Sequence, residues 1–69
     1  MKLLDSRDLG VYTLDFIGDE QYAQILKRYG FIPGAKITIV LKKKGCIVVD
    51  VLDCKYSINK ELANIIFIK

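Results

Sequence analysis

The feature that most constrains the fold is the stretch YGFIPGAKITIV, from Tyr29 to Val40, which holds two glycines and the only proline of the chain. Glycines beside a lysine also occur in phosphate-binding loops, where the backbone must approach an anion closely. That template requires Gly-Lys-Ser/Thr leading directly into a helix, whereas Gly34, Lys36 and Thr38 are separated here by apolar residues. The stretch therefore predicts a corner between a helix and a strand.

The segment before this corner, DEQYAQILKRYG, has the spacing of an amphipathic helix. Its apolar residues fall at positions i, i+3, i+4 and i+7, which places them on one side of a helix: Tyr22, Ile25, Leu26 and Tyr29. Asp19 is a suitable N-cap, because its carboxylate can accept a hydrogen bond from the first turn. We expect a helix of two to three turns whose apolar stripe packs in the core.

Local chemistry predicts how this helix ends. Gly30 suits the left-handed position just after a helix, and Phe31 can then fold back on Leu26 as the hydrophobic contact of a Schellman motif. Pro33 and Gly34 suit the two central positions of a type II turn, since proline fixes φ and glycine tolerates positive φ. These five residues form the predicted structural motif.

One strand is predicted before the helix and one after it. The first runs from Val11 to Ile17 and directs Leu14 and Phe16 inward. The second follows the corner with a two-residue alternation, so that one set of residues is expected to face the core and the other the outside. The inner set is Ile37, Ile39 and Leu41, and the outer set is Thr38, Val40 and Lys42.

The remaining sequence predicts three more short strands. Cys46 to Leu52 forms a hairpin with the second strand, and a fourth strand contains Tyr56 and Ile58 with Ser57 pointing outward. Asn59 then caps one helical turn, and the final NIIFIK forms the fifth strand. Short strands with tight connections can remove their exposed edges by closing into a barrel. We expect a mainly β fold, a small five-stranded barrel with one helix after the first strand and a short helical turn before the last.

Length and composition favour a single domain over residues 1–69, because 69 residues support only one small core and 52% of them are hydrophobic. No apolar run is long enough to span a bilayer, and the N-terminus MKLLDSRD becomes polar too early for a signal peptide. We therefore expect a cytoplasmic protein without direct membrane insertion.

The sequence contains no histidine and no recognisable catalytic group, so we expect no enzyme and no small-molecule substrate. Asp50 and Asp53 are the nearest approach to paired carboxylates, but one lies on a strand and the other in a turn. Cys46 and Cys54 are too far apart along an extended strand for a disulfide or a shared metal, unless the chain bends sharply.

Metal binding follows no known template, and no cofactor is expected. Scattered carboxylates could supply weak oxygen sites for a divalent cation: Asp5, Asp8, Asp15, Asp19, Glu20, Asp50 and Asp53. Adventitious transition-metal binding at these carboxylates or at Cys54 is the alternative to a protein without metal.

A candidate partner-binding surface follows from the alternation of the hairpin. With Ile47, Val49 and Val51 facing the core, apolar residues remain outside beside a run of lysines. The candidate surface consists of Val40, Lys42, Lys43, Lys44, Val48 and Leu52. The lysines are equally consistent with a solvated hairpin tip, and the outer apolar residues with a surface covered by the helix or the N-terminal segment.

A longer pattern over nearly the whole chain after Gly10 resembles a known family. It comprises Leu26, Tyr29, Gly30, Phe31, Pro33, Gly34, Ile37, Ile39, Ile47, Val49, Val51, Tyr56, Ile58, Ala63, Ile66 and Ile68. This pattern is similar to that of the ferrous iron transport protein A (FeoA) family, and the GF.PG corner is its most specific part. The chain departs from the family in its short LKKKG tip, in Asp53 where glycine is common, and in apolar Val48 and Leu52 at positions that are commonly polar.

The resemblance implies a cytoplasmic SH3-like barrel that assists a membrane ferrous-iron transporter carrying a G-protein domain. Its partner would be the cytosolic part of that transporter, and the chain itself a monomer or a weak homo-oligomer. A similar barrel forms the C-terminal domain of metal-dependent repressors resembling the diphtheria toxin repressor, which is the second interpretation. A nucleic-acid-binding SH3-like module is the third, and it rests only on the net charge of +3.

Overall fold

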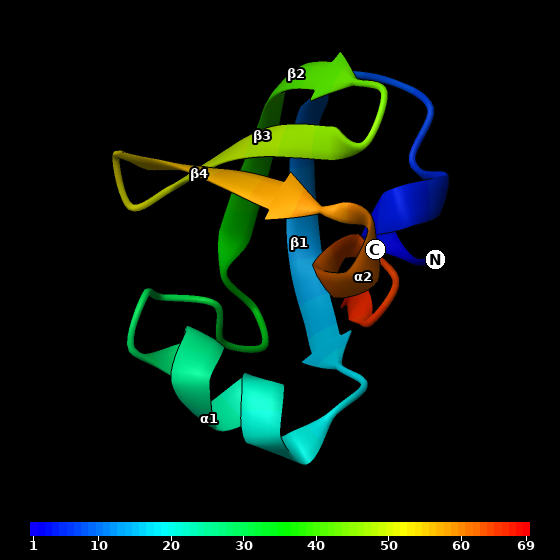
Figure 1. The fold of residues 1–69 in the computed structure, drawn as a ribbon. Coiled ribbons are helices and arrows are strands. Elements are labelled where there is room, and N and C mark those ends of the chain that lie inside the picture. Colours follow the sequence, from blue (N-terminus) through cyan, green and yellow to red (C-terminus); the bar gives the residue numbers. More distant parts are fainter.

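Five antiparallel strands form one curled sheet in this computed structural model, which describes residues 1–69 (Figure 1). The strands are β1 (Gly10–Ile17), β2 (Lys36–Lys43), β3 (Cys46–Val51), β4 (Cys54–Asn59) and β5 (Ile66–Ile68). Their order across the sheet is β4-β3-β2-β1-β5, so β4 and β5 lie at opposite ends and do not pair. The mainly β, SH3-like prediction is confirmed, with the strands curled into a half-barrel whose seam lies between β4 and β5.

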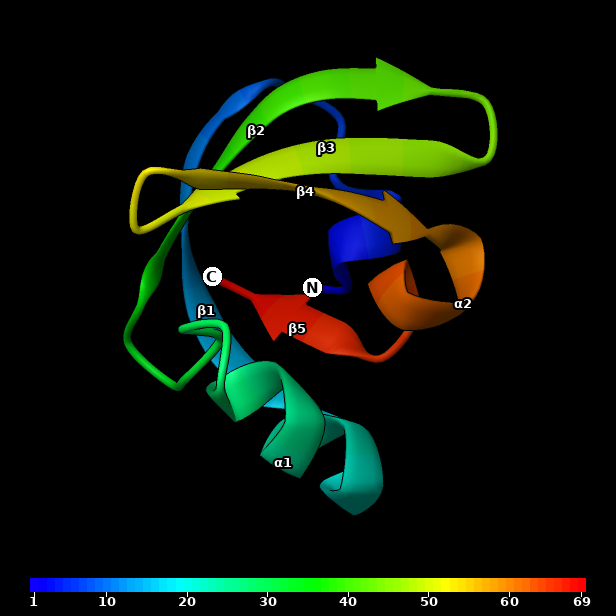
Figure 2. The same cartoon turned by 60° about the vertical axis from the view of Figure 1, so that its left-hand side comes forward.

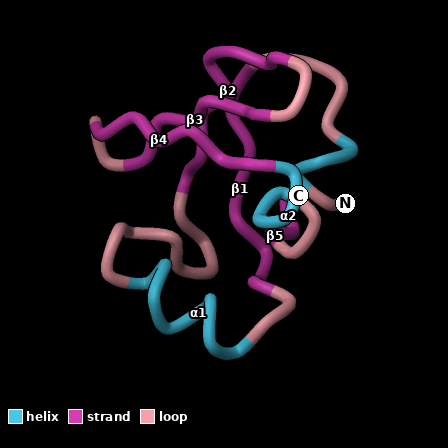
Figure 3. The backbone as a smooth tube through the Cα atoms, viewed as in Figure 1, coloured by secondary structure: helices cyan, strands magenta, loops and turns pink.

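Short helical elements connect and cover the sheet, as the cyan segments of Figure 3 show. They are the 3₁₀ turn η1 (Leu3–Asp5), α1 (Glu20–Lys27) after β1, and α2 (Lys60–Ala63) before β5. Both predicted helix caps are confirmed, because the Asp19 side chain accepts a hydrogen bond from the Tyr22 amide (3.0 Å) and the Asn59 side chain accepts one from the Leu62 amide (2.9 Å). Only η1 was not predicted.

The corner after α1 has the predicted geometry. Gly30 has a φ of +93°, its amide donates to the Lys27 carbonyl (3.2 Å), and the Phe31 amide donates to the Leu26 carbonyl (3.1 Å). These are the two hydrogen bonds of a Schellman motif. Gly34 has a φ of +92°, and the Ala35 amide donates back to the Ile32 carbonyl (2.9 Å), which closes the type II turn over Pro33 and Gly34.

The core fills the concave side of the sheet, and Figure 2 shows η1, α2 and β5 beneath the arch of β2, β3 and β4. It contains 13 buried hydrophobic residues: Leu3, Leu14, Leu26, Phe31, Ile37, Ile39, Ile47, Val49, Val51, Ile58, Ala63, Ile66 and Ile68. Leu3 is completely buried, so η1 supplies a plug for the half-barrel. The apolar side chains of α2 and η1 thus occupy the seam that a β4–β5 pairing would otherwise close.

A bulge in β1 overturns one predicted orientation. The register between β1 and β5 shifts between Leu14 and Phe16, so the two-residue alternation changes phase there. Leu14 is buried as predicted, but Phe16 is 47% exposed and stacks against Phe67 with ring centroids 4.4 Å apart. The prediction that Phe16 points inward is wrong for this reason.

A second bulge, in β2, moves two further residues. Ile39 pairs with Val49 and Leu41 pairs with Val48, so Val40 is the extra residue of the bulge. Leu41 is therefore 42% exposed and not in the core. Lys42 lies opposite the buried Ile47, on the inner side of the sheet, although the sequence placed it outside.

The apolar stripe of α1 is mostly outside the core. Leu26 is buried, whereas Tyr22, Ile25 and Tyr29 are about half exposed. The helix lies at one end of the half-barrel, where β1 is the strand that it contacts most (Figure 1). The prediction that the whole stripe packs in the core is wrong, because a short helix at the rim buries only the residue that points at the sheet.

Candidate functional site

The lysines at the end of β2 and in the β2–β3 loop point in different directions. The Lys42 ammonium donates a hydrogen bond to the Ser6 carbonyl on the inner side, so this cation is occupied by the protein itself. Lys43 and Lys44 are exposed. Only two ion pairs occur in the structure, Lys55 with Asp50 (3.4 Å) and Lys69 with Asp15 (3.8 Å). Lys43 and Lys44 thus carry charges that no carboxylate of this chain balances.

A small pocket of about 180 Å³ opens beside this loop. Its floor is apolar and its rim is cationic, because Lys60 at the start of α2 joins the loop lysines. The lining residues are Leu4, Lys42, Lys43, Lys44, Gly45, Cys46, Ile47, Ile58, Lys60 and Ala63. Lys60 was not predicted as a site residue, since only the fold brings α2 next to the hairpin tip.

Exposed apolar side chains gather on the outer face of the same hairpin. Val40 and Leu41 of β2 are 37% and 42% exposed, and Leu41 lies directly opposite the half-buried Val48 of β3. We call Val40, Leu41 and Val48 the outer apolar patch. By the two-residue alternation Lys43 follows Leu41 on this face, so a free cation borders the patch. The structure therefore brings Val40, Val48 and Lys43 together as predicted, and adds Leu41.

Leu52 lies apart from this surface. It occupies the two-residue turn between β3 and β4, at the end of β3 opposite the lysines (Figure 1). Its side chain is 77% exposed and lies over Gly30. Both residues of the turn have positive φ, 52° for Leu52 and 65° for Asp53. Leucine is a costly residue in this conformation, whereas aspartate tolerates it.

A larger groove of about 760 Å³ lies between α1, the end of β1 and the residues that follow the helix, Phe31 to Pro33. Phe16, Ile32 and Pro33 contribute its apolar surface, and Glu20 and Lys27 of the helix lie at its edge. None of these residues was predicted to form a surface, because the exposure of Phe16 depends on the β1 bulge.

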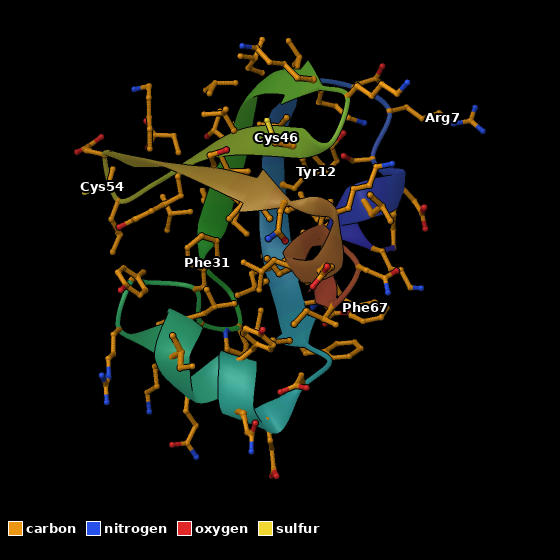
Figure 4. All side chains as sticks on the ribbon, viewed as in Figure 1. Arg7, Tyr12, Phe31, Cys46, Cys54 and Phe67 are labelled. Atoms are coloured by element: carbon orange, nitrogen blue, oxygen red, sulfur yellow. The ribbon has the colours of Figure 1, made fainter.

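The acidic and sulfur-containing residues do not converge. Cys46 and Cys54 are free thiols on adjacent strands, and they pair with Asn59 and Val51 at opposite ends of the β3–β4 ladder (Figure 4). Asp50 is held by Lys55, while Asp53 lies in the turn. No group of three or more cysteine, aspartate or glutamate side chains is placed to hold a metal ion.

The surroundings of Tyr56 perturb the pKa of its phenol. Burial raises the pKa of its phenol above the ordinary 10.0, and the neighbouring Cys54 and Tyr29 shift it in the same direction. The Tyr56 ring packs edge-on against Tyr29 (5.7 Å) and tilted against Phe31 (5.6 Å). A neutral phenol at physiological pH fits a packing role and no acid-base chemistry.

Neither α1 nor α2 has the length and apolar character needed to cross a bilayer.

The family of the chain is shown by its match to a known domain. The family model described as the FeoA domain matches residues 1–69, the full chain. The chain belongs to the FeoA family. This family consists of non-enzymatic accessory proteins linked to ferrous iron uptake, so the FeoA chain is not an enzyme, as its sequence predicted.

Solved structures support the fold of this FeoA chain. An iron uptake regulatory protein (FeoA) superposes with a TM-score of 0.85 at 23% identity, over 100% of this chain and 93% of that one. A FeoA-like protein from Clostridium acetobutylicum gives 0.86 at 18% identity, over 100% and 84%. ScaR, solved with bound Cd²⁺, gives a TM-score of 0.91 at 17% identity, but the chain spans only 34% of its length. No curated protein matches the chain in sequence.

Proposed function

We propose that this FeoA chain is a cytoplasmic accessory protein that docks on the cytosolic part of a membrane ferrous-iron transporter carrying a G-protein domain. Membership of a family linked to ferrous iron uptake supports the pathway. The dispersed carboxylates and thiols support binding as the mode of action, since nothing in the chain assembles a reactive centre.

The observation that carries the docking proposal is the outer apolar patch bordered by free lysines. Interfaces commonly combine an apolar contact area with a polar rim, and complementary charge accelerates the encounter of two proteins. Val40, Leu41 and Val48 supply the contact, and Lys43 and Lys44 supply an unbalanced positive rim. Lys42 and Leu52 belong to the predicted set but not to this surface, because one faces inward and the other lies at the far turn.

The experiment is to measure binding of the purified chain to the soluble G-protein domain by calorimetry. Leu41→Glu should abolish detectable binding, because it puts a charge in the centre of the patch. Lys43→Glu combined with Lys44→Glu should weaken binding at low salt and lose this effect at high salt. Ile25→Glu is the matched control, since Ile25 is 50% exposed, slightly more than Leu41, but lies on α1.

Equal binding by Leu41→Glu and wild type would refute the patch. Absence of binding by the wild type would refute the transporter as partner. That result would favour one of two other roles, a protein-contact module like the C-terminal barrel of the metal-dependent repressors or a nucleic-acid-binding barrel. Salt-sensitive binding to DNA or RNA would identify the latter.

A further inference from the structure

The two edge strands of the sheet, β4 and β5, differ in whether another segment covers their outer edge. The outer edge of β5 is covered by the N-terminal residues, because the Ile68 amide donates to the Met1 carbonyl (2.7 Å) and Lys2 forms a bridge with Phe67. The outer edge of β4 has no such cover. Its only strand neighbour is β3, and none of the backbone hydrogen bonds made by turns, loops and caps involves residues 54–59.

The geometry of the hairpin shows which β4 groups are free. The loop between β3 and β4 has two residues, so the closing pair Val51–Cys54 is of the hydrogen-bonded kind. Hydrogen-bonded and non-hydrogen-bonded pairs alternate along an antiparallel ladder. Lys55 and Ser57 therefore direct their amide and carbonyl groups away from β3, and both residues are exposed. Four backbone groups are available to a further strand.

This edge also lacks the usual protection against pairing. Exposed edges are normally blocked by proline, by a bulge or by a free charge. The β3–β4 register is continuous over all six pairs, without a bulge, and β4 contains no proline. Its one charged residue is Lys55, which is paired with Asp50 (3.4 Å). The edge is regular, and its charge is already balanced.

We propose that β4 accepts an extended segment of a protein partner as a sixth, antiparallel strand. Such strand addition is a common mode of peptide recognition, in which backbone hydrogen bonds give affinity and alternate side chains give specificity. The inference rests on the proposed function only in that the partner is a protein, and it uses a different part of the molecule from the outer apolar patch.

The surroundings of β4 define the chemistry of the added segment. On the inner side it would pass the half-buried Tyr56 and the buried Ile58, which favour apolar residues. Near the far end of β4 it would meet the free Lys60 and Lys44, which line the pocket beside the β2–β3 loop and favour acidic residues. The matching sequence alternates acidic and apolar residues. A second copy of this chain, with net charge +3, would instead bring like charges together.

The test uses the peptide Glu-Val-Glu-Ile-Glu-Val and amide hydrogen exchange measured by NMR on the full chain. In the free protein the Lys55 and Ser57 amides should exchange quickly, and the Tyr56 and Ile58 amides slowly. At millimolar peptide the exchange of Lys55 and Ser57 should slow by about tenfold, because their amides gain partners.

Backbone methylation of the peptide supplies the matched control. In an antiparallel pair the residues that bond to Lys55 and Ser57 have their side chains on the same face, so they are the glutamates. N-methylation of the glutamates should abolish the protection, and N-methylation of Val and Ile should preserve it. No protection at millimolar peptide, or equal effects of both methylations, would overturn the proposal.

Further outcomes distinguish strand addition from self-association of the chain and from docking of the G-protein domain at another surface. Protection of Lys55 and Ser57 that rises with protein concentration in the absence of peptide would overturn it in favour of a second copy. Binding of the G-protein domain without protection at β4 would overturn strand addition by the transporter and leave the proposed function intact. Strand addition by the peptide without binding of the domain would refute the proposed function and leave strand addition at β4 intact.

Discussion

Replacing Leu52 by asparagine should stabilise the protein. Leu52 has a φ of 52°, and a leucine in the left-handed region costs about 1 to 2 kcal/mol. Asparagine adopts this region readily, and it is a preferred residue in hairpin turns with two positive φ values. Against this gain stands the lost contact of the leucine side chain.

The structure allows that loss to be bounded. A leucine that is fully buried contributes about 1.5 to 3 kcal/mol. Leu52 is 77% exposed, so its contact with Gly30 and its neighbours contributes about a quarter of that, at most about 0.7 kcal/mol. The net gain in the free energy of unfolding is about 1 kcal/mol, which corresponds to a rise in Tm of about 4 to 8 °C for a domain of this size.

The assay is thermal unfolding followed by circular dichroism, with Leu52→Ala as the control. Alanine keeps the left-handed penalty and removes the same contact, so Leu52→Ala should melt slightly below wild type. If Leu52→Asn melted no higher than Leu52→Ala, the turn would carry no backbone strain and the reasoning would be refuted.

Three other predictions concern stability. Gly30→Val should lower the free energy of unfolding by at least about 2 kcal/mol, because valine is strained at the φ of +93° that residue 30 adopts. The Cβ atom of the new side chain would also lie 2.7 Å from the Cδ1 atom of Leu52. An unchanged Tm would contradict this. Gly30→Ala should cost less in the Leu52→Asn background than in wild type, which a double-mutant cycle of unfolding free energies can measure. Treatment with EDTA should leave the Tm unchanged, since the core needs no metal, and a loss of structure would show the opposite.

A fourth prediction concerns pH. Because the pKa of Tyr56 is raised in the folded state, the folded chain holds this proton when the unfolded chain has lost it, and stability should fall as the pH rises above about 10. Below that pH Tyr56 contributes no pH dependence. Tyr56→Phe should reduce the alkaline loss, as denaturant titrations at pH 9 and 11 would reveal.

Local sequence determined the parts of the fold that were predicted correctly. Asp19, Gly30 and the Pro33–Gly34 turn act through their own backbone geometry and nearest neighbours, so no distant information was needed. The orientations of Phe16 and Leu41 were mispredicted because each depends on a bulge, and a bulge is a property of two paired strands. An alternating pattern in one strand cannot show where its partner shifts register.

The candidate surfaces likewise combine positions set by local sequence with positions that depend on tertiary structure. The outward positions of the exposed Val40 and the half-buried Val48 could be predicted from alternation. The turn of Lys42 toward Ser6 could not, since it requires the N-terminal segment to lie under β2. Lys60 joins the loop lysines only through tertiary structure. The free edge of β4 was missed because closure of the barrel was assumed, and the seam is filled by side chains of η1 and α2 instead.

The pairing of β1 with β5 has a consequence for folding kinetics. Leu14 lies opposite Ile68, so two buried residues near the two ends of the chain meet only after most of the chain has been brought together. The entropy of closing this large loop must be paid before the buried contacts compensate for it. We expect slow, highly cooperative folding compared with a helical domain of equal length, because distant contacts dominate the sheet. Removing either end would leave the other without its partner in the core, and neither part would retain a stable fold.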